Sequence, residues 1–147
     1  MGGFFGATSR KNCVLDVFFG TDYHSHLGTR RGGMAAYDPE KGFQREIHNI
    51  ENSPFRTKFQ RILEEMTGTA AIGCISDTDP QPILIRSNLG CYAICTIGII
   101  NNAEALIKQY LTFSGGHFES MSGGKINANE LIAALIDQKS SFAEGIR

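Results

Sequence analysis

The first residues of the chain, Met1-Gly2-Gly3-Phe4-Phe5-Gly6, form a short apolar run at a chain end. A chain end stays loose unless a neighbouring element holds it. Glycines on both sides of two phenylalanines indicate a strand whose backbone is closely approached by its neighbours. Removal of the initiator Met, which is usual before a small second residue, would place Gly2 at the terminus. We therefore predict an opening strand buried in a sheet, around which the rest of the chain is organised.

Length and charge limit what the chain can be. At 147 residues it is long enough for one domain with a substantial core. Its net charge of -1 and its lack of a basic run argue against nucleic acid or an anionic membrane as a partner. No stretch is apolar for long enough to cross a bilayer, and the N-terminus lacks the order of a signal peptide. We therefore expect a cytoplasmic protein with neither partner.

The four cysteines show no C-x-x-C spacing; they are Cys13, Cys74, Cys91 and Cys95. That spacing is typical of zinc knuckles and of thioredoxin-type redox pairs, so neither is indicated. In a cytosolic protein such cysteines are most simply reduced, buried and small hydrophobic residues.

Apolar spacing in the first half of the chain predicts strands and one clear helix. Residues 13–19 are too densely apolar to decide between helix and strand, and residues 20–37 have the composition of a loop that runs into a strand near Met34. Residues 44–50 alternate as a strand does. Ser53 as N-cap and Pro54 at the first helical position predict a helix that ends at Gly68. Its apolar face consists of Phe55, Phe59, Ile62, Leu63 and Met66.

The second half alternates between strand and helix signals. Strands are expected over 70–76, 83–87 and 91–100, the last two as a hairpin. Three helices follow, one capped by Asn101 or Asn102, one by Asn127 or Asn129, and one that starts at Phe142 behind Ser140 or Ser141. Between the first two lies a glycine-rich stretch, 114–125. It has Glu119 and Ile126 where a Walker phosphate loop needs Gly and Ser or Thr, so we do not expect such a loop.

Three segments resemble one known family. The opening Met1-Gly2-Gly3-Phe4-Phe5-Gly6 resembles the start Met-Cys-Gly-Ile-x-Gly, and Arg31-Gly32 followed by Ala35-Ala36 resembles Gln-His-Arg-Gly-x-x-x-Ala-Gly, with Arg30 replacing the His. The run from Thr96 to Asn102 resembles His-Asn-Gly-x-x-x-Asn. These are segments of the glutaminase (class II glutamine amidotransferase) domain of the amidophosphoribosyltransferases, which are N-terminal nucleophile hydrolases.

The resemblance implies a fold and an extent. The implied fold class is α+β, a four-layer αββα sandwich of two antiparallel sheets between helices. Residues 1–147 would form one glutaminase-like domain, but they match only rather more than the first half of it, so we expect a copy truncated at its C-terminal side. In the family a phosphoribosyltransferase domain follows and would be the partner. An incomplete sandwich exposes sheet edges and apolar surface, which favours a homo-oligomer.

The resemblance also shows which groups of the family's chemistry are replaced. Amide hydrolysis needs a nucleophile, a base and oxyanion donors. Gly2 stands at the position of the family's nucleophilic Cys, and Ile97 at that of the Asn that helps to bind the oxyanion. Ser76 replaces the Arg that binds the substrate carboxylate in Gly-His-x-Arg-Tyr, and Asp77 beside it would repel a carboxylate. The run Asn127-Ala128-Asn129-Glu130 keeps only the Glu of Ser-Asp-Ser-Glu, whose Asp binds the substrate ammonium.

The size of these losses indicates a domain without glutaminase activity. One lost oxyanion donor costs about 10²- to 10³-fold in rate, and loss of the nucleophile costs on the order of 10⁶-fold. We therefore expect no catalytic residue, no cofactor and no bound metal, and a role as a scaffold or regulatory module in a protein of the purine-biosynthesis family. A substrate-binding remnant is kept: Arg31, Gly32, Gly98 and Asn102. Gln81-Pro82 and Glu130 are also kept and are interpreted as scaffold.

Several alternatives stay open. Cys74, Cys91 or Cys95 could act as a displaced nucleophile, although no basic group lies close to any of them in sequence. Asp22, His24 and His26 could bind a metal, although such a pair of histidines is more often part of a polar loop. The chain could be a stand-alone binding module. The altered pocket could be open or filled, and we expect Phe4, Phe5 and Ile97 to fill it.

Overall fold

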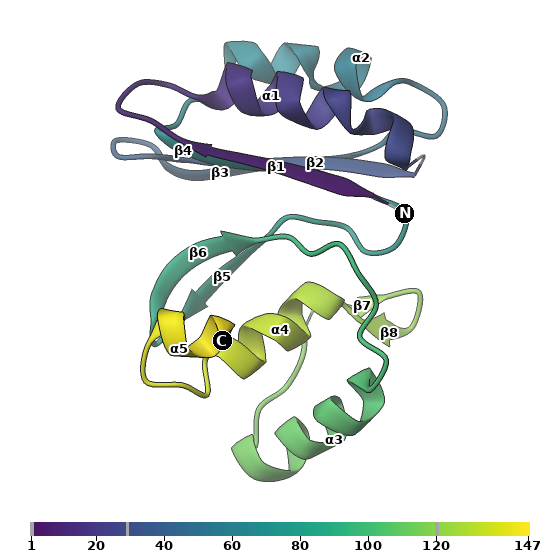
Figure 1. Cartoon of the computed structure of the whole chain (residues 1–147), viewed down its shortest axis with the longest axis vertical. Coiled ribbons are helices and arrows are strands. Elements are labelled where there is room, and N and C mark those ends of the chain that lie inside the picture. The colour runs from purple at the N-terminus through teal and green to yellow at the C-terminus, as the bar shows by residue number, and fades with distance from the viewer. Residues whose placement is uncertain (1, 29, 120) are drawn as a thin grey trace.

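Two antiparallel sheets lie face to face between helices in the computed structural model, which describes residues 2–28, 30–119 and 121–147 (Figure 1). The expected segments above include Met1, Thr29 and Ser120, which lie outside the described residues. A small apolar space between the sheets, about 280 Å³, is lined by both of them, among others by Ala35, Ile72, Tyr92 and Ala93. The α+β class and the αββα layering are therefore confirmed.

The first sheet has four strands in the order β1-β4-β2-β3. They are β1 (Gly3–Thr8), β2 (Arg31–Asp38), β3 (Gly42–Asn49) and β4 (Ala70–Ser76). All three pairings are antiparallel, and β4 lies between β1 and β2, so that Gly3 and Gly32 both face Ile75 in register. The strands expected near Met34, over 44–50 and over 70–76 are confirmed.

The opening strand exists but its expected burial is wrong. Because β1 pairs only with β4, it lies at an edge of the sheet, and Phe4 remains 60% exposed. The close approach that its glycines suggested is present: a Cβ on Gly3 would lie 3.0 Å from the His24 side chain. The glycines thus indicated close packing against one face of the strand. They could not show whether a second strand pairs with its other edge.

Helices cover the outer face of this sheet (Figure 1). They are α1 (Val14–Tyr23), the 3₁₀ turn η1 (Ser25–Leu27), α2 (Phe55–Phe59) and the 3₁₀ turn η2 (Gln60–Glu64). Alternate residues of β2 and β4 point toward them, as period-2 strands require. The resulting main core consists of Cys13, Val14, Val17, Phe18, Met34, Ala36, Ile50, Phe55, Phe59, Ile62, Met66, Ala71 and Ile75.

Two helix boundaries differ from the sequence prediction. The undecided stretch 13–19 is helical from Val14 onward, with Cys13 as N-cap, and α1 continues to Tyr23 where a loop was expected. Pro54, not Ser53, is the N-cap of α2, and the segment tightens to 3₁₀ geometry after Phe59 instead of continuing to Gly68. Apolar residues spaced three and four apart lie on one side of both an α-helix and a 3₁₀-helix. Their spacing therefore could not show which of the two helix types the segment adopts.

The second layer is built from the rest of the chain. It contains the hairpin β5 (Ile83–Ser87) and β6 (Gly90–Ile94), α3 (Ala103–Ser114), the short hairpin β7 (Met121–Ser122) and β8 (Lys125–Ile126), α4 (Ala128–Ile136) and α5 (Phe142–Ile146). Asn127 caps α4 by accepting from Asn129 N at 2.9 Å, and Ser141 caps α5 by accepting from Glu144 N at 3.3 Å. Both caps were among the predicted ones. The apolar side of α3 stays largely uncovered, because none of its residues is buried.

The strand expected over 91–100 ends early, at Ile94. The backbone of Thr96 bonds instead to the side chain of Gln81. Gln81 belongs to a segment that passes directly under β2, where a Cβ on Gly33 would lie 1.8 Å from Gln81 O. This contact joins the two layers beside the N-terminus. Among the described residues, no helix is both long and apolar enough to cross a membrane.

Candidate functional site

A cavity of about 480 Å³ lies beside Gly2, at the end of the first sheet. Its walls come from β4 and the turn after it and from the segment after β6: Gly2, Ser76, Asp77, Thr78, Thr96, Ile97, Gly98 and Ile99. The fold thus brings together the three positions that the resemblance assigned to the nucleophile, the oxyanion Asn and the carboxylate Arg. These positions are far apart in the sequence; the pairing of β1 with β4 brings Gly2 next to the end of β4, and the segment after β6 adds Ile97.

The cavity is open, so the expectation that Phe4, Phe5 and Ile97 fill it is wrong. Ile97 lines it, whereas neither phenylalanine does. The ring of Phe5 lies over α1, where a Cβ on Gly20 would be 2.3 Å from it. Phe4 points to the opposite side of β1, because neighbouring residues of a strand alternate, and is mostly exposed.

Position 2 has no room for a side chain in this backbone. A Cβ on Gly2 would lie 2.2 Å from the carbonyl oxygen of Ile75 and 3.1 Å from Cδ1 of Ile97. The first of these distances is far below van der Waals contact and involves backbone, so strand β1 or β4 would have to move. A thiol at this position would therefore require a shift of the backbone.

The Ser76 side chain is hydrogen-bonded within the turn that follows β4, and it is uncharged. It is 3% exposed, its Oγ accepts from Thr78 N at 3.2 Å, and it shares a second hydrogen bond of 3.2 Å with Thr78 Oγ1. Next to it, Asp77 Oδ1 accepts from Arg30 N at 3.2 Å. At the position of the Arg that binds the substrate carboxylate in the family, the cavity wall thus carries the neutral hydroxyl of Ser76 and, beside it, the negatively charged side chain of Asp77.

A second cavity of about 500 Å³ adjoins the first, and both are lined by Asp77, Thr78, Gly98 and Ile99. Of the predicted remnant, Arg31 and Gly98 line it. Arg31 Nη1 donates to the carbonyl oxygen of Thr78, which holds the guanidinium against the cavity wall. Ala128 also lines this cavity, and its backbone N donates to Asp79 Oδ2 at 3.2 Å.

The other two remnant residues lie away from the cavities. Gly32 faces the helices, since a Cβ there would be 2.6 Å from the Phe55 ring and 3.3 Å from the Phe59 ring. Asn102 is the N-cap residue of α3, with no capping bond from its side chain. Neither Gly32 nor Asn102 is therefore among the described residues that line the two cavities.

The proposed rescues of catalysis or metal binding find little support in the geometry. The described lining of the Gly2 cavity contains no cysteine. Asp22 pairs with Arg56 through Oδ2, at 3.1 Å from Nε and 2.5 Å from Nη2, and no group of three potential ligands for a metal occurs among the described residues. His24 and His26 instead contact the ring of Tyr23 edge-on.

Two thiols do meet behind the cavity wall. The side chains of Cys74 of β4 and Cys95 after β6 interact with each other. The interaction with Cys95 and burial raise the pKa of the Cys74 thiol, and the interaction with Cys74 lowers the pKa of Cys95. Sequence spacing missed this pair, because 20 intervening residues separate the two positions along the chain. Cys91 is exposed, which corrects the expectation that all four cysteines are buried.

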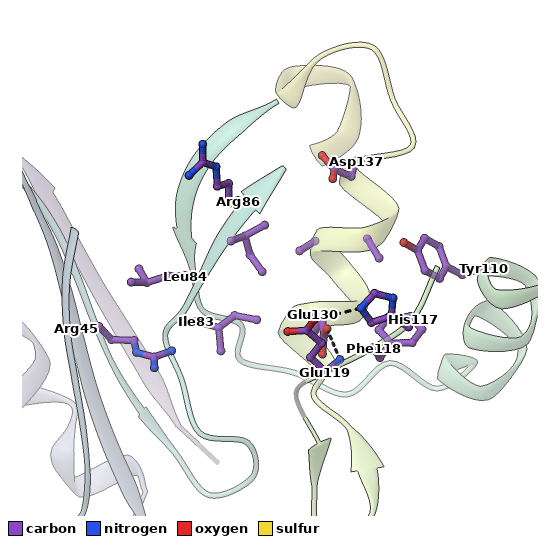
Figure 2. Close-up of a pocket in the computed structure, with 13 residues that line it drawn as sticks. Arg45, Ile83, Leu84, Arg86, Tyr110, His117, Phe118, Glu119, Glu130 and Asp137 are labelled. Carbon is purple, nitrogen blue, oxygen red and sulfur yellow. Dashed lines mark hydrogen bonds and ion pairs between the residues drawn. The ribbon is translucent and has the colours of Figure 1, made fainter. Parts of the chain in front are cut away.

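A further cavity of about 420 Å³ lies between β5, α4 and the glycine-rich segment (Figure 2). Arg45 and Arg86 line it together with acidic residues. Glu130 Oε1 accepts from Glu119 N at 2.7 Å, and His117 lies 3.1 Å from Glu119 Oε1, as the dashed lines show (Figure 2). The glycine-rich segment follows a helix and runs into the β7–β8 hairpin, whereas a phosphate loop joins a strand to a helix. The absence of a phosphate loop is thus confirmed.

Solved structures with the same fold are available for comparison, whereas no protein-family model and no curated protein matches the sequence. Glutamine phosphoribosylpyrophosphate amidotransferase from B. subtilis, in complex with ADP and GMP, is similar over 99% of this chain, with a TM-score of 0.80 and 24% identity. A structure described as the allosteric regulatory enzyme of purine biosynthesis is similar over 99% of this chain, with a TM-score of 0.77 and 25% identity.

The resemblance inferred from three short segments is therefore confirmed at the level of the fold. This chain covers 31% and 32% of the two similar chains, so it spans about a third of their length. It has the fold of the glutaminase-like part of an amidophosphoribosyltransferase.

Proposed function

We propose that this chain is a glutaminase-type domain of an amidophosphoribosyltransferase-like protein that no longer hydrolyses glutamine. It acts as a scaffold or regulatory module. The observation that supports this most directly is the makeup of the Gly2 cavity. The positions of nucleophile, oxyanion donor and carboxylate partner lie around one space, and they hold Gly2, Ile97 and Ser76.

The remaining groups offer no evident replacement for the lost ones. Among the described residues that line the cavity there are hydroxyls but neither a thiol nor an imidazole. The Ser76 hydroxyl is bonded within its own turn. With Ile97 in place of an amide, the side chain at that position cannot donate to an oxyanion, a loss of about 10²- to 10³-fold in rate before the nucleophile is considered.

The open state of the cavity favours a ligand-binding role over a purely structural one. A concave, mostly apolar space with few polar groups is typical of small-molecule sites. The walls are apolar at Ile97 and Ile99 and polar at the turn of Ser76, Asp77 and Thr78. A regulatory ligand of mixed character would suit them better than glutamine, whose carboxylate would meet Asp77.

The wider setting follows from the same family. We propose a phosphoribosyltransferase domain as the partner, self-association into a homo-oligomer, a cytoplasmic location and a place in purine biosynthesis. Exposed apolar side chains such as Phe4, Ile99 and Phe113 support association. Sedimentation velocity of the chain, with the Phe4→Ser variant beside it, tests this: a monomer at all concentrations would contradict it.

Alkylation by a glutamine-analogue diazoketone tests the loss of chemistry. The reagent labels the nucleophile of active amidotransferases, and intact mass reports the adduct. We expect no adduct on this protein, while an active class II amidotransferase treated in parallel is fully labelled. An adduct that maps to Cys74, Cys91 or Cys95 would show a displaced nucleophile and overturn the proposal.

A further inference from the structure

Cys74 and Cys95 come from different layers of the fold, and their side chains interact with each other. Cys74 belongs to β4 of the first sheet, whereas Cys95 directly follows β6 of the second. Cys74 is 0% exposed, and its Sγ lies 3.4 Å from Gln81 O, to which it donates. Cys95 is only partly buried. Cys95 therefore keeps some contact with solvent, whereas Cys74 is fully buried.

The backbone around both thiols is held in place. Gln81, whose carbonyl bonds Cys74, uses its side chain to bond Thr96, the residue after Cys95. The same short segment thus positions both cysteines. A preorganised pair needs little rearrangement to react, and the thiol with the lower pKa is the one that attacks an oxidant.

We propose that Cys74 and Cys95 form a redox-active dithiol that a hydroperoxide oxidises to an intramolecular disulfide. The Cys95 thiolate attacks one peroxide oxygen, the O–O bond breaks, and the leaving oxygen departs as water or an alcohol after protonation. Cys74 then attacks the sulfenic sulfur of Cys95, the S–O bond breaks, and water leaves. The two sulfurs together lose two electrons, which the peroxide gains.

The disulfide would act on the Gly2 cavity. Cys74 lies two residues before Ser76 on one wall, and Cys95 lies one residue before Thr96 on the other. A covalent bond between them would join these walls and fix the width of the cavity at its base. This inference does not depend on whether the domain has lost glutaminase activity.

The remaining cysteines provide internal controls. Cys13 lies in the main core, where its Sγ donates to Gly68 O at 3.5 Å. Cys91 is exposed on β6. If oxidation followed exposure alone, Cys91 would react first and would link two molecules. If it follows the geometry, Cys74 and Cys95 react with each other.

Peptide mapping after treatment with one equivalent of hydrogen peroxide distinguishes these outcomes. Free thiols are blocked with iodoacetamide before digestion without reductant. We expect a mass loss of about 2 Da and a peptide pair that joins Cys74 to Cys95. Cys95→Ser and Cys74→Ser abolish this pair, whereas Cys91→Ser leaves it unchanged. Dominant dimers through Cys91, or sulfinic acid on Cys95 with Cys74 still open to alkylation, would overturn the proposal.

Thermal unfolding of the unsubstituted chain gives a second readout, which does not depend on whether the Cys74→Ser variant folds. The disulfide closes a loop of roughly 20 residues, so the oxidised chain should melt about 5–10 °C higher than the reduced chain. Dithiothreitol should reverse this shift, and Cys95→Ser should not show it. If peptide mapping shows that the Cys74–Cys95 disulfide has formed completely and the melting temperature is unchanged, the disulfide does not stabilise the fold, and the proposed effect on the cavity is wrong.

Discussion

The side chain of Gln81 bonds the backbone of Thr96 in both directions. Its Oε1 accepts from Thr96 N at 2.8 Å, and its Nε2 donates to Thr96 O at 3.0 Å. An amide side chain thus replaces the neighbouring strand that Thr96 lacks after β6 ends. Gln81 is 2% exposed, so these bonds are protected from water. The interpretation of Gln81-Pro82 as scaffold agrees with this arrangement.

Gln81→Ala should lower the free energy of unfolding by about 2–3 kcal/mol, because the N–H and C=O of Thr96 both lose their partner, a buried side chain. Gln44→Ala is the matched control. Gln44 makes the same pair of bonds, to Thr67, at a partly exposed position, so its loss should cost about 1 kcal/mol. Urea unfolding followed by circular dichroism measures both. Equal losses would show that burial of the Gln81 pair adds nothing.

Gly33→Ala should destabilise the contact between the layers. A Cβ there would lie 1.8 Å from Gln81 O and 2.7 Å from Cδ of Pro82, and backbone cannot move away as a side chain can. We expect a loss of about 3 kcal/mol, the upper part of the range for overpacking. Gly98→Ala is the control, since nothing lies within 4 Å of its Cβ position. A Gly33→Ala variant as stable as Gly98→Ala would contradict the packing.

Gly2→Cys should not restore glutaminase activity. The new Cβ would lie 2.2 Å from Ile75 O, and the side chains at 76 and 97 would still lack the groups that bind substrate and oxyanion. Ammonia release from glutamine should stay at the level of the unmodified chain, with a loss of about 2 kcal/mol in stability. Gly98→Cys adds a thiol to the same cavity without a clash and serves as control. Turnover by Gly2→Cys alone would mean that the lost nucleophile was the only defect.

Acid should destabilise the turn at the end of β2. Hydrogen bonds from the backbone of Glu40, from the Thr67 hydroxyl and from the backbone of Lys41 hold the pKa of Asp38 below its ordinary value of 3.8. Because the folded-state pKa is the lower one, this contribution is complete above the unfolded-state pKa and is lost as pH falls through the folded-state value. Stability measured from pH 5 down to pH 2 should therefore fall less steeply in Asp38→Asn than in the parent chain.

Thr67→Val separates this effect from general acid unfolding. It removes the bond of 2.8 Å from Thr67 Oγ1 to Asp38 Oδ2 and leaves the two backbone bonds. Its acid profile should lie between those of the parent and Asp38→Asn. Three identical profiles would show that Asp38 does not govern the acid limb.

The sequence by itself determined the elements whose signals are local. The β5–β6 hairpin, the strand over 70–76, the Asn127 and Ser141 caps and the apolar face from Phe55 to Met66 all follow from periodicity or from capping chemistry within a few residues. Three short motifs were enough to indicate the fold. Two of them named Gly2 and Ile97, and a further matched segment named Ser76; the structure then places all three residues around one cavity.

Tertiary structure decided what depends on partners distant in sequence. The edge position of β1, the end of β6 at Ile94, the open cavity and the meeting of Cys74 with Cys95 each arise from segments that the sequence separates widely. Gly32 and Gly98 look alike as motif residues, yet one packs against Phe55 and the other lines the cavities. Local patterns carry the preference of a segment for helix or strand, whereas exposure and neighbours are set only when the layers pack.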